Sequence, residues 1–140
     1  MSERPALEIA WLLGLLALGG FLASRLVARP WVVAGPSMRP TLEHGDRVLV
    51  DPWTYRHRDP RPGELLLFVS GDSLLVKRVA RALRQDRAGS RATDTGGIWV
   101  LGDNPEESVD SRSFGPVARD RVLGRVVFRY WPPSRAGPIR

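Results

Sequence analysis

The sequence contains no cysteine, which excludes disulfides, thiolate metal sites and a cysteine nucleophile. Lysine is almost as scarce, because Lys77 is the only lysine among 21 basic residues. The two histidines, His44 and His57, lie in polar, turn-rich stretches and have no obvious relay partner. An enzyme built from this chain would therefore take its general base from a very short list of side chains.

Acidic residues are in the minority, and the formal net charge is +6. A basic protein of this kind can bind nucleic acid or an anionic membrane surface. The arginines are spread over the whole chain, and no recognised nucleic-acid-binding pattern accompanies them. We therefore expect no nucleic-acid partner. The excess of arginine fits either a solvated surface or attraction to anionic lipid headgroups.

The sequence has one long hydrophobic run, Ile9–Ala23, which covers 15 residues without a charge. A membrane span needs about 20 apolar residues, a length reached here if the side chain of Arg25 snorkels to the interface. We expect residues 1–30 to form an N-terminal tail and an uncleaved membrane anchor helix that ends at Pro30. A cleaved signal peptide and an interfacial helix are the alternatives.

The rest of the chain consists of short apolar runs separated by turn residues. Six runs are predicted to be strands: Trp31–Ala34, Arg47–Asp51, Glu64–Val69, Ser73–Leu83, Ile98–Leu101 and Val122–Trp131. Two polar stretches, Gln85–Gly97 and Gly102–Pro116, are predicted to be loops. The pattern favours a mainly β fold, a small antiparallel β-barrel-like domain over residues 31–132, with a flexible tail over 133–140.

Two residues carry a possible catalytic chemistry. Ser37 follows an apolar strand in the tight turn Gly35–Leu42, and a serine hydroxyl needs a nearby base to become a nucleophile. Lys77 lies inside an apolar strand, where it and Arg78 must point to opposite faces. A buried lysine loses its charge more easily, and the neutral amine can accept the serine proton. A turn-forming serine and a strand lysine that reaches solvent remain the structural alternative.

The loop Gly102–Pro116 holds four carboxylates and three serines. Such a composition could form a calcium site, but the spacing does not match the EF-hand pattern. Arg112 in the middle of the loop favours an internal ion pair instead. Short polar side chains also bond their own backbone, so we expect this loop to be rigid.

Five blocks, GPSMRPTL, GDRVLVD, VKRV, GDNPEESVDSRSFGPV and GRVVFRYWP, occur in one order over residues 35–132. This arrangement resembles the type I signal peptidases, a family of Ser/Lys proteases with a β fold. The resemblance implies a catalytic domain over residues 31–132 in which Ser37 attacks the scissile carbonyl and Lys77 is the base. It further implies that Ser108 orients the lysine and that Asp110 and Arg112 form a supporting ion pair.

The resemblance also implies how substrate is bound. A precursor segment would add as an extended strand along a cleft. The residues expected to line that cleft are Trp31, Val32, Val33, Ala34 and Met38.

Three departures from the family pattern stand out. Some relatives carry a hydroxyl residue as an oxyanion donor two places before the nucleophile, where this chain has Gly35, so the backbone N–H of Ser37 would take that role. The lysine strand runs into ARALRQDRAGS instead of a Gly-x-Pro-Gly-Asp turn. Only 24 residues separate Lys77 from Gly102, where larger relatives insert a second β subdomain.

The compact form suggests a particular branch. The stretches VLVDPWTYRHRDPRPGELLL and GDNPEESVDSRSFG resemble the short proteases that mature nickel-containing superoxide dismutase. Two functions therefore stay open, a general protease for N-terminal signal or leader peptides and a dedicated dismutase maturation protease. No cofactor is expected, and any nickel would belong to the substrate.

The expected partners are precursor proteins and the lipid membrane, which the chain would cross once. The family resemblance places the catalytic domain on the outer face of the cell membrane. Arg25 and Arg29, on the C-terminal side of the anchor, favour the cytoplasmic face as the alternative. A membrane-anchored peptide-binding module without catalysis is a further possibility, but it leaves the combination of Ser37 and Lys77 unexplained.

Overall fold

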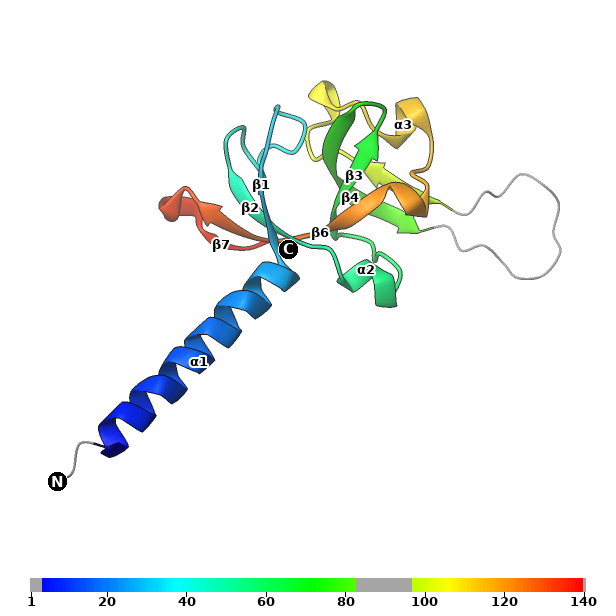
Figure 1. Ribbon diagram of the computed structural model, residues 1–140. Coiled ribbons are helices and arrows are strands. Elements are labelled where there is room, and N and C mark those ends of the chain that lie inside the picture. The colour runs from blue at the N-terminus through cyan, green and yellow to red at the C-terminus, as the bar shows by residue number, and fades with distance from the viewer. Residues whose placement is uncertain (1–3, 83–96, 140) are drawn as a thin grey trace, which may run out of the picture.

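A computed structural model of the chain describes residues 4–82 and 97–139, in which one long helix precedes a β domain (Figure 1). The helix α1 spans Arg4–Val27 and ends three residues before Pro30, which already belongs to the first strand. Within the described residues, no helix is both long and apolar enough to cross a membrane. The anchor predicted over residues 1–30 is therefore not confirmed.

The β domain is one antiparallel sheet with strands of unequal length. Its strands are β1 (Arg29–Val32), β2 (Arg47–Asp51), β3 (Leu65–Ser70), β4 (Ser73–Ala82), β5 (Ile98–Leu101), β6 (Val122–Trp131) and β7 (Gly137–Pro138). They are arranged in the order β1-β2-β6-β3-β4-β5, and β7 pairs with β6. The bounds predicted for β2, β5 and β6 are confirmed, whereas β1 starts and ends two residues earlier than predicted.

The sheet is open, so the barrel-like closure predicted from the sequence is wrong. In the described part of the chain, β1 pairs only with β2, and β5 pairs with β4 apart from one isolated bridge between Ile98 and Val117. Both edge strands have four residues, and no pairing among the described residues joins them to each other. The mainly antiparallel β character is confirmed.

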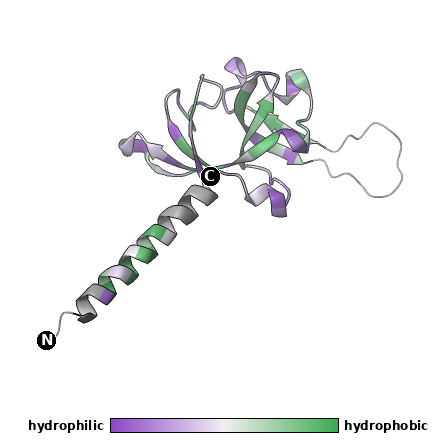
Figure 2. Cartoon of the chain, viewed as in Figure 1, coloured by the Kyte–Doolittle hydropathy of each residue, from purple (hydrophilic) through white to green (hydrophobic). Residues whose placement is uncertain are grey.

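Hydrophobic side chains are buried on both faces of the sheet, and Figure 2 shows apolar residues concentrated on its central strands. Strand β3 has a continuous apolar run, because alternate residues face opposite clusters. The first cluster contains Val33, Met38, Leu42, Val48, Val50, Leu65, Leu67, Val76 and Val126. The second contains Tyr55, Leu66, Phe68, Val79, Ile98, Val100 and Val117.

Short helical turns lie in the connections. They are α2 (Thr54–His57), α3 (Ser111–Phe114) and the 3-10 turns η1 (Pro105–Glu107), η2 (Arg119–Arg121) and η3 (Pro133–Arg135). The loop predicted over Gln85–Gly97 lies outside the described residues, except for Gly97.

The C-terminal segment 133–139 does not form the free tail expected from its sequence. After η3, strand β7 pairs with β6 through Phe128 and Pro138, and Ile139 packs against the first cluster. The ion pair between Arg135 and the buried Asp46 holds the turn in place. These contacts offset the chain entropy that a tail rich in Pro and Gly would otherwise retain.

Candidate active site

Lys77 lies in the middle of β4 and is only 2% exposed. Leu66 of β3 is its cross-strand partner, and Leu75 and Val79 lie two positions away on the same strand face. Burial lowers the pKa of the Lys77 ammonium, the nearby carboxylate of Asp110 opposes this, and the cation of Arg112 adds to it. The net shift is downward, which makes the neutral amine more accessible than in a free lysine.

Lys77 is joined to the loop after β5 by a hydrogen-bond chain. Its Nζ donates to Ser108 Oγ at 3.0 Å, and the Ser108 hydroxyl donates to Asp110 Oδ2 at 2.9 Å. Because the only hydrogen of the Ser108 hydroxyl is used on Asp110, its oxygen must act as the acceptor for the lysine. The serine therefore fixes the direction in which the lysine head points.

Asp110 is fully buried and accepts hydrogen bonds from several sides. Arg112 donates to it through Nε at 2.9 Å and through a terminal nitrogen at 2.7 Å, and the backbone N–H of Gly102 donates at 2.9 Å. The Arg112 guanidinium is the main cause that holds the pKa of Asp110 well below its usual range, and the Gly102 and Ser108 bonds contribute. The carboxylate is therefore ionised at any ordinary pH, as one half of an ion pair.

Ser37 lies in the turn that follows β1, and its side chain is partly exposed. The turn is fixed from below, because Met38 and Leu42 are buried in the first cluster and Leu42 N donates to Met38 O at 2.8 Å. Among the described residues, no hydrogen bond joins Ser37 Oγ to Lys77. Catalytic hydrogen bonds are often long without substrate and shorten in the complex.

Gly102 is the point where the Ser37 turn and the Lys77–Ser108 pair meet. A Cβ atom added to Gly102 would lie 2.0 Å from Ser108 Oγ and 2.7 Å from the carbonyl oxygen of Ser37. The same Ser37 carbonyl accepts a hydrogen bond from Asn104 N at 3.0 Å. Two segments distant in sequence, the Ser37 turn and the loop after β5, therefore pack together at one glycine, and only a residue without a side chain fits there.

The five residues expected to line a substrate cleft fall into two groups. Val32 and Ala34 are exposed at the β1 edge, and Trp31 is half-buried. Val33 and Met38, by contrast, are buried within the first cluster, and their contact with a substrate stays a prediction. Strand alternation explains the difference between Val32 and Val33.

Two contacts of this region were not foreseen from the sequence. The N–H of Gly35, which has φ +84°, donates to His44 Nδ1 at 3.2 Å. Arg78 donates to both oxygens of Asp103, at 2.8 and 2.7 Å, and to Thr41 Oγ1 at 3.3 Å. Arg78 therefore ties the Ser37 loop to the loop after β5.

A buried carboxylate secures the far end of the Ser37 loop. Asp46 accepts from Glu43 N at 2.9 Å and forms ion pairs with Arg129 and Arg135 at 3.3 and 3.4 Å. Arg129 also donates to the carbonyl oxygen of Thr41 at 2.7 Å. The loop that presents Ser37 is therefore fastened by residues from the C-terminal part of the domain.

Comparisons with known proteins match this chain to one family and to several relatives. The family described as "Signal peptidase, peptidase S26" matches residues 6–87 and 81–131. A mitochondrial ATP-independent inner membrane protease subunit 1a of Arabidopsis thaliana is 34% identical over an alignment of 125 positions that covers 77% of this chain and 73% of that protein. A signal peptidase I of Leptolyngbya laminosa is 26% identical over an alignment of 174 positions that covers 99% of this chain and 86% of that protein.

The chain is shorter than some of its relatives. Thylakoidal processing peptidase 1 of Arabidopsis thaliana is 28% identical over an alignment of 148 positions that covers 78% of this chain but only 44% of that protein. The chain thus spans less than half the length of this relative.

Proposed function

We infer that this chain, which belongs to the signal peptidase family (peptidase S26), is a serine endopeptidase that removes N-terminal signal or leader peptides from precursor proteins. Ser37 is the nucleophile in this proposal and Lys77 the general base. The observation that carries the assignment is the buried Lys77 amine, held by Ser108 beside the turn that presents Ser37.

The reaction begins when neutral Lys77 takes the proton of Ser37 Oγ as that oxygen attacks the scissile carbonyl. Ser108 occupies one side of the amine, so the lone pair of Nζ is left for the serine. The ammonium then gives its proton to the leaving amine, and the C–N bond breaks to leave an acyl-enzyme. Lys77 then takes a proton from a water molecule as that water attacks the acyl-enzyme carbonyl. The ester C–O bond to Ser37 breaks, the leader leaves as a carboxylic acid, and Lys77 returns the proton to Ser37 Oγ.

The charges below the site favour the neutral amine at the start. An isolated Asp110 carboxylate would stabilise the ammonium of Lys77, but Arg112 pairs with that carboxylate. The Asp110–Arg112 pair therefore has little net charge, and burial of the amine dominates its pKa. In the proposed mechanism, the ion pair with Arg112 keeps the Asp110 carboxylate from stabilising the ammonium of Lys77.

The oxyanion is proposed to bind at the backbone N–H of Ser37. Within the described residues this N–H donates no hydrogen bond, which supports the assignment. The neighbouring Gly35 N–H is already used on His44, and Gly35 has no side chain to contribute. A backbone N–H that donates to the developing oxyanion typically contributes a large part of the rate enhancement in acyl transfer.

The precursor is proposed to add to the free edge of β1. Among the described residues that strand pairs on one side only, so its other side offers unpaired backbone groups. Val32, which is 54% exposed, and Ala34 would contact alternate side chains of an extended peptide.

The membrane anchor is also part of the proposal. Six apolar side chains of α1 between positions 11 and 18 are each more than half exposed: Trp11, Leu12, Leu13, Leu15, Leu16 and Leu18. These positions lie on more than half of the helix circumference, and nothing in the described chain covers them. A lipid environment accounts for such a helix. We place the catalytic domain on the outer face of the cell membrane, and protease protection of vesicles distinguishes this from the cytoplasmic face.

A dedicated maturation protease for nickel superoxide dismutase is the second candidate. The short connection supports it, since β4 ends at Ala82 and β5 begins at Ile98, without space for a second β subdomain. Cleavage of a dismutase leader peptide but not of a general signal peptide would select this narrower function.

The test uses the full chain in detergent micelles with a fluorogenic leader peptide. Ser37→Ala should reduce kcat/KM at least ~1000-fold, because no nucleophile remains. Ser113→Ala, an exposed serine of α3, is the matched control and should keep wild-type activity.

Lys77→Arg should be equally inactive, because arginine stays protonated. Lys77→Met is a second variant in case the buried guanidinium prevents folding, and circular dichroism checks the fold of each. A Ser37→Ala enzyme that cleaves at the wild-type rate would refute the nucleophile, and an active Lys77→Met enzyme would refute the base.

A further inference from the structure

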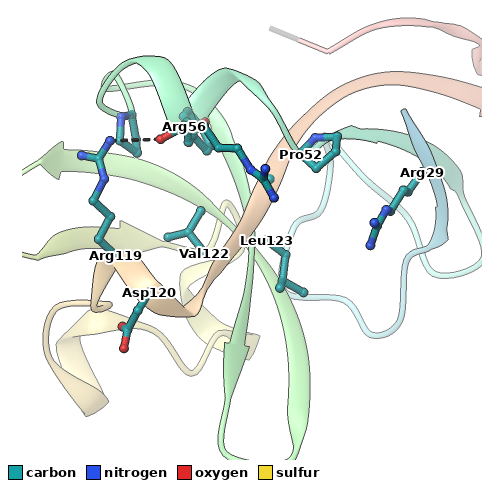
Figure 3. A pocket seen from close by; sticks show the side chains of 10 residues that line it. Arg29, Pro52, Arg56, Arg119, Asp120, Val122 and Leu123 are labelled. Atoms are coloured by element: carbon teal, nitrogen blue, oxygen red, sulfur yellow. Dashed lines mark hydrogen bonds between the residues drawn. The ribbon is translucent and has the colours of Figure 1, made fainter. Parts of the chain in front are cut away.

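A second concave site lies away from Ser37, between the start of β1, α2 and the start of β6. It is a cavity of about 350 Å³ whose walls include Arg29, Arg56 and Arg119 (Figure 3). The three arginines come from β1, α2 and η2, so chain segments far apart in sequence bring three guanidinium groups to one cavity. Nothing in the proposed proteolytic mechanism uses this cavity.

Two of the three arginines are available to a ligand. Arg119 is engaged, since it pairs with Asp59 and donates to the carbonyl oxygen of Tyr55 at 3.0 Å. In the described part of the chain, neither Arg29 nor Arg56 has a carboxylate within ion-pair distance, and Arg56 lies over the ring of Trp53 at 4.4 Å. Of the described residues that line the cavity, Asp120 is the one acidic residue, so this lining has an excess of positive charge. An anion is the ligand that this charge favours.

The remaining lining is apolar. Pro52, Val122 and Leu123 form part of the wall, and Leu123 is 41% exposed. Trp53, which stacks with Arg56, is exposed as well. A free inorganic anion would gain nothing from these side chains, whereas an anion attached to a hydrocarbon chain would bury apolar surface against them.

The position of the cavity along the chain points to the source of such an anion. Arg29 comes two residues after Val27, the last residue of α1. If α1 is inserted in a bilayer, Arg29 lies at the level of the lipid headgroups, where guanidinium groups attract anionic lipids. This step rests on the membrane anchor of the proposed function.

We propose that this cavity binds the phosphate group of an anionic glycerophospholipid. Arg29 and Arg56 contact the phosphate, and Leu123 and Trp53 contact the upper part of an acyl chain. Arginine suits this role because its planar guanidinium donates two parallel hydrogen bonds to phosphate oxygens. The bound lipid would fix the β domain against the membrane surface beside the end of α1.

The experiment is a calorimetric titration of the full chain in dodecyl maltoside micelles. Dihexanoyl-phosphatidylglycerol should bind saturably, whereas dihexanoyl-phosphatidylcholine and inorganic phosphate should bind much more weakly. The double variant Arg29→Gln/Arg56→Gln should bind the anionic lipid roughly 30-fold more weakly, from about fivefold per arginine. Arg61→Gln/Arg81→Gln removes the same charge from two exposed sites outside the cavity and should bind like the wild type.

Asp120→Asn tests the same site in the opposite direction. It removes the acidic residue of the lining, so affinity for the anionic lipid should rise about fivefold. Equal binding by the Arg29→Gln/Arg56→Gln variant and the wild type would overturn the site, and so would equal loss in the Arg61→Gln/Arg81→Gln control. Phosphate binding as strong as lipid binding would identify a free-anion site and overturn the lipid.

The outcome is separable from the proposed function. Cleavage of a leader peptide in the same micelles measures the proteolytic activity. Alkaline carbonate extraction of membranes tests whether the chain is anchored in the bilayer. A chain that fails either of these but binds phosphatidylglycerol through Arg29 and Arg56 keeps the headgroup site. If the chain cleaves the peptide and remains in the membrane but does not bind the lipid, the proposed headgroup site is refuted.

Discussion

Lys77 Nζ lies 3.0 Å from Ser108 Oγ, although the two residues are 31 positions apart in the sequence. One belongs to the centre of β4 and the other to the loop after β5. The orientation of the proposed base therefore depends on a residue of a different segment. Substitutions of Lys77 and of Ser108 should have different effects on cleavage.

Ser108→Ala removes the acceptor of Lys77 without adding volume. The amine would keep its burial but lose its orientation, and misplacement of a catalytic group costs up to about 100-fold. We expect kcat/KM for a leader peptide to fall by about that factor, with the thermal unfolding midpoint little changed. Ser113→Ala in the neighbouring α3 controls for loss of a hydroxyl, and unchanged kinetics in Ser108→Ala would show that Lys77 needs no partner.

Gly102→Ala places a methyl group against Ser108 Oγ and the carbonyl oxygen of Ser37. Overpacking of this kind typically costs about 1–3 kcal/mol, because the backbone oxygen cannot move aside like a flexible side chain. We expect urea denaturation to show a lower free energy of unfolding, together with reduced cleavage. Gly137→Ala is the matched control, since a Cβ atom added at that position would meet nothing within 4 Å. Equal stability of the two variants would contradict the crowding around Gly102.

Arg112→Gln should alter the pH dependence of cleavage. A general base must be neutral, so kcat/KM of the wild type should rise with pH through the pKa of Lys77, which burial has lowered. Loss of the Arg112 cation leaves the Asp110 carboxylate free to stabilise the Lys77 ammonium, which raises the pKa of Lys77. The rising limb should therefore move to higher pH.

The profile would be measured from about pH 6 to 10 for the wild type, Arg112→Gln and Arg61→Gln, a range that brackets the lowered lysine pKa. Arg61 is exposed and remote from the Asp110 network, so its replacement controls for the change in net charge. A rising limb that stays in place or moves to lower pH in Arg112→Gln would contradict the electrostatic role of the ion pair.

His44 and His57 offer a paired test of the base. His44 accepts the Gly35 N–H next to the Ser37 turn, and a single hydrogen bond is worth about 1 kcal/mol. His44→Ala should therefore reduce kcat/KM only about fivefold, and His57→Ala, whose residue is exposed on α2, should leave it unchanged. A loss of three orders of magnitude in either variant, with the fold retained, would assign the base to histidine and not to Lys77.

Local patterns predicted the strands well, because alternation and turn residues act over a few positions. The bounds of β2, β5 and β6 followed from such patterns alone. Closure of the sheet could not be predicted from local patterns. It depends on whether the edge strands β1 and β5 meet, and no local pattern encodes a contact between them. Strand β1 ends at Val32, two residues earlier than predicted.

The site was predicted mainly from its resemblance to a family and not from periodicity. Spacing alone could place Lys77 on an apolar strand face, but it could not bring Ser108 to it. The sequence did not predict the contacts that hold the Ser37 loop, which involve Arg78, His44 and Asp46. Each contact joins residues whose spacing in the sequence follows no helix or strand period. The one signal in the sequence for these contacts was the position of an acid, Asp46, between a turn and a strand.

Strand order has a consequence for the time at which this protein can act. The Ser37 turn extends from β1 and β2, Lys77 lies on β4, and only β6 lies between β2 and β3 in the sheet. Ribosomes deliver β6 after every other strand of the two halves, and Arg129 on it fastens the Ser37 loop. A nascent chain that has exposed both Ser37 and Lys77 still lacks the strand that joins them. The proposed dyad is therefore assembled only after β6 has been translated, by the arrival of a segment that contributes no reacting group.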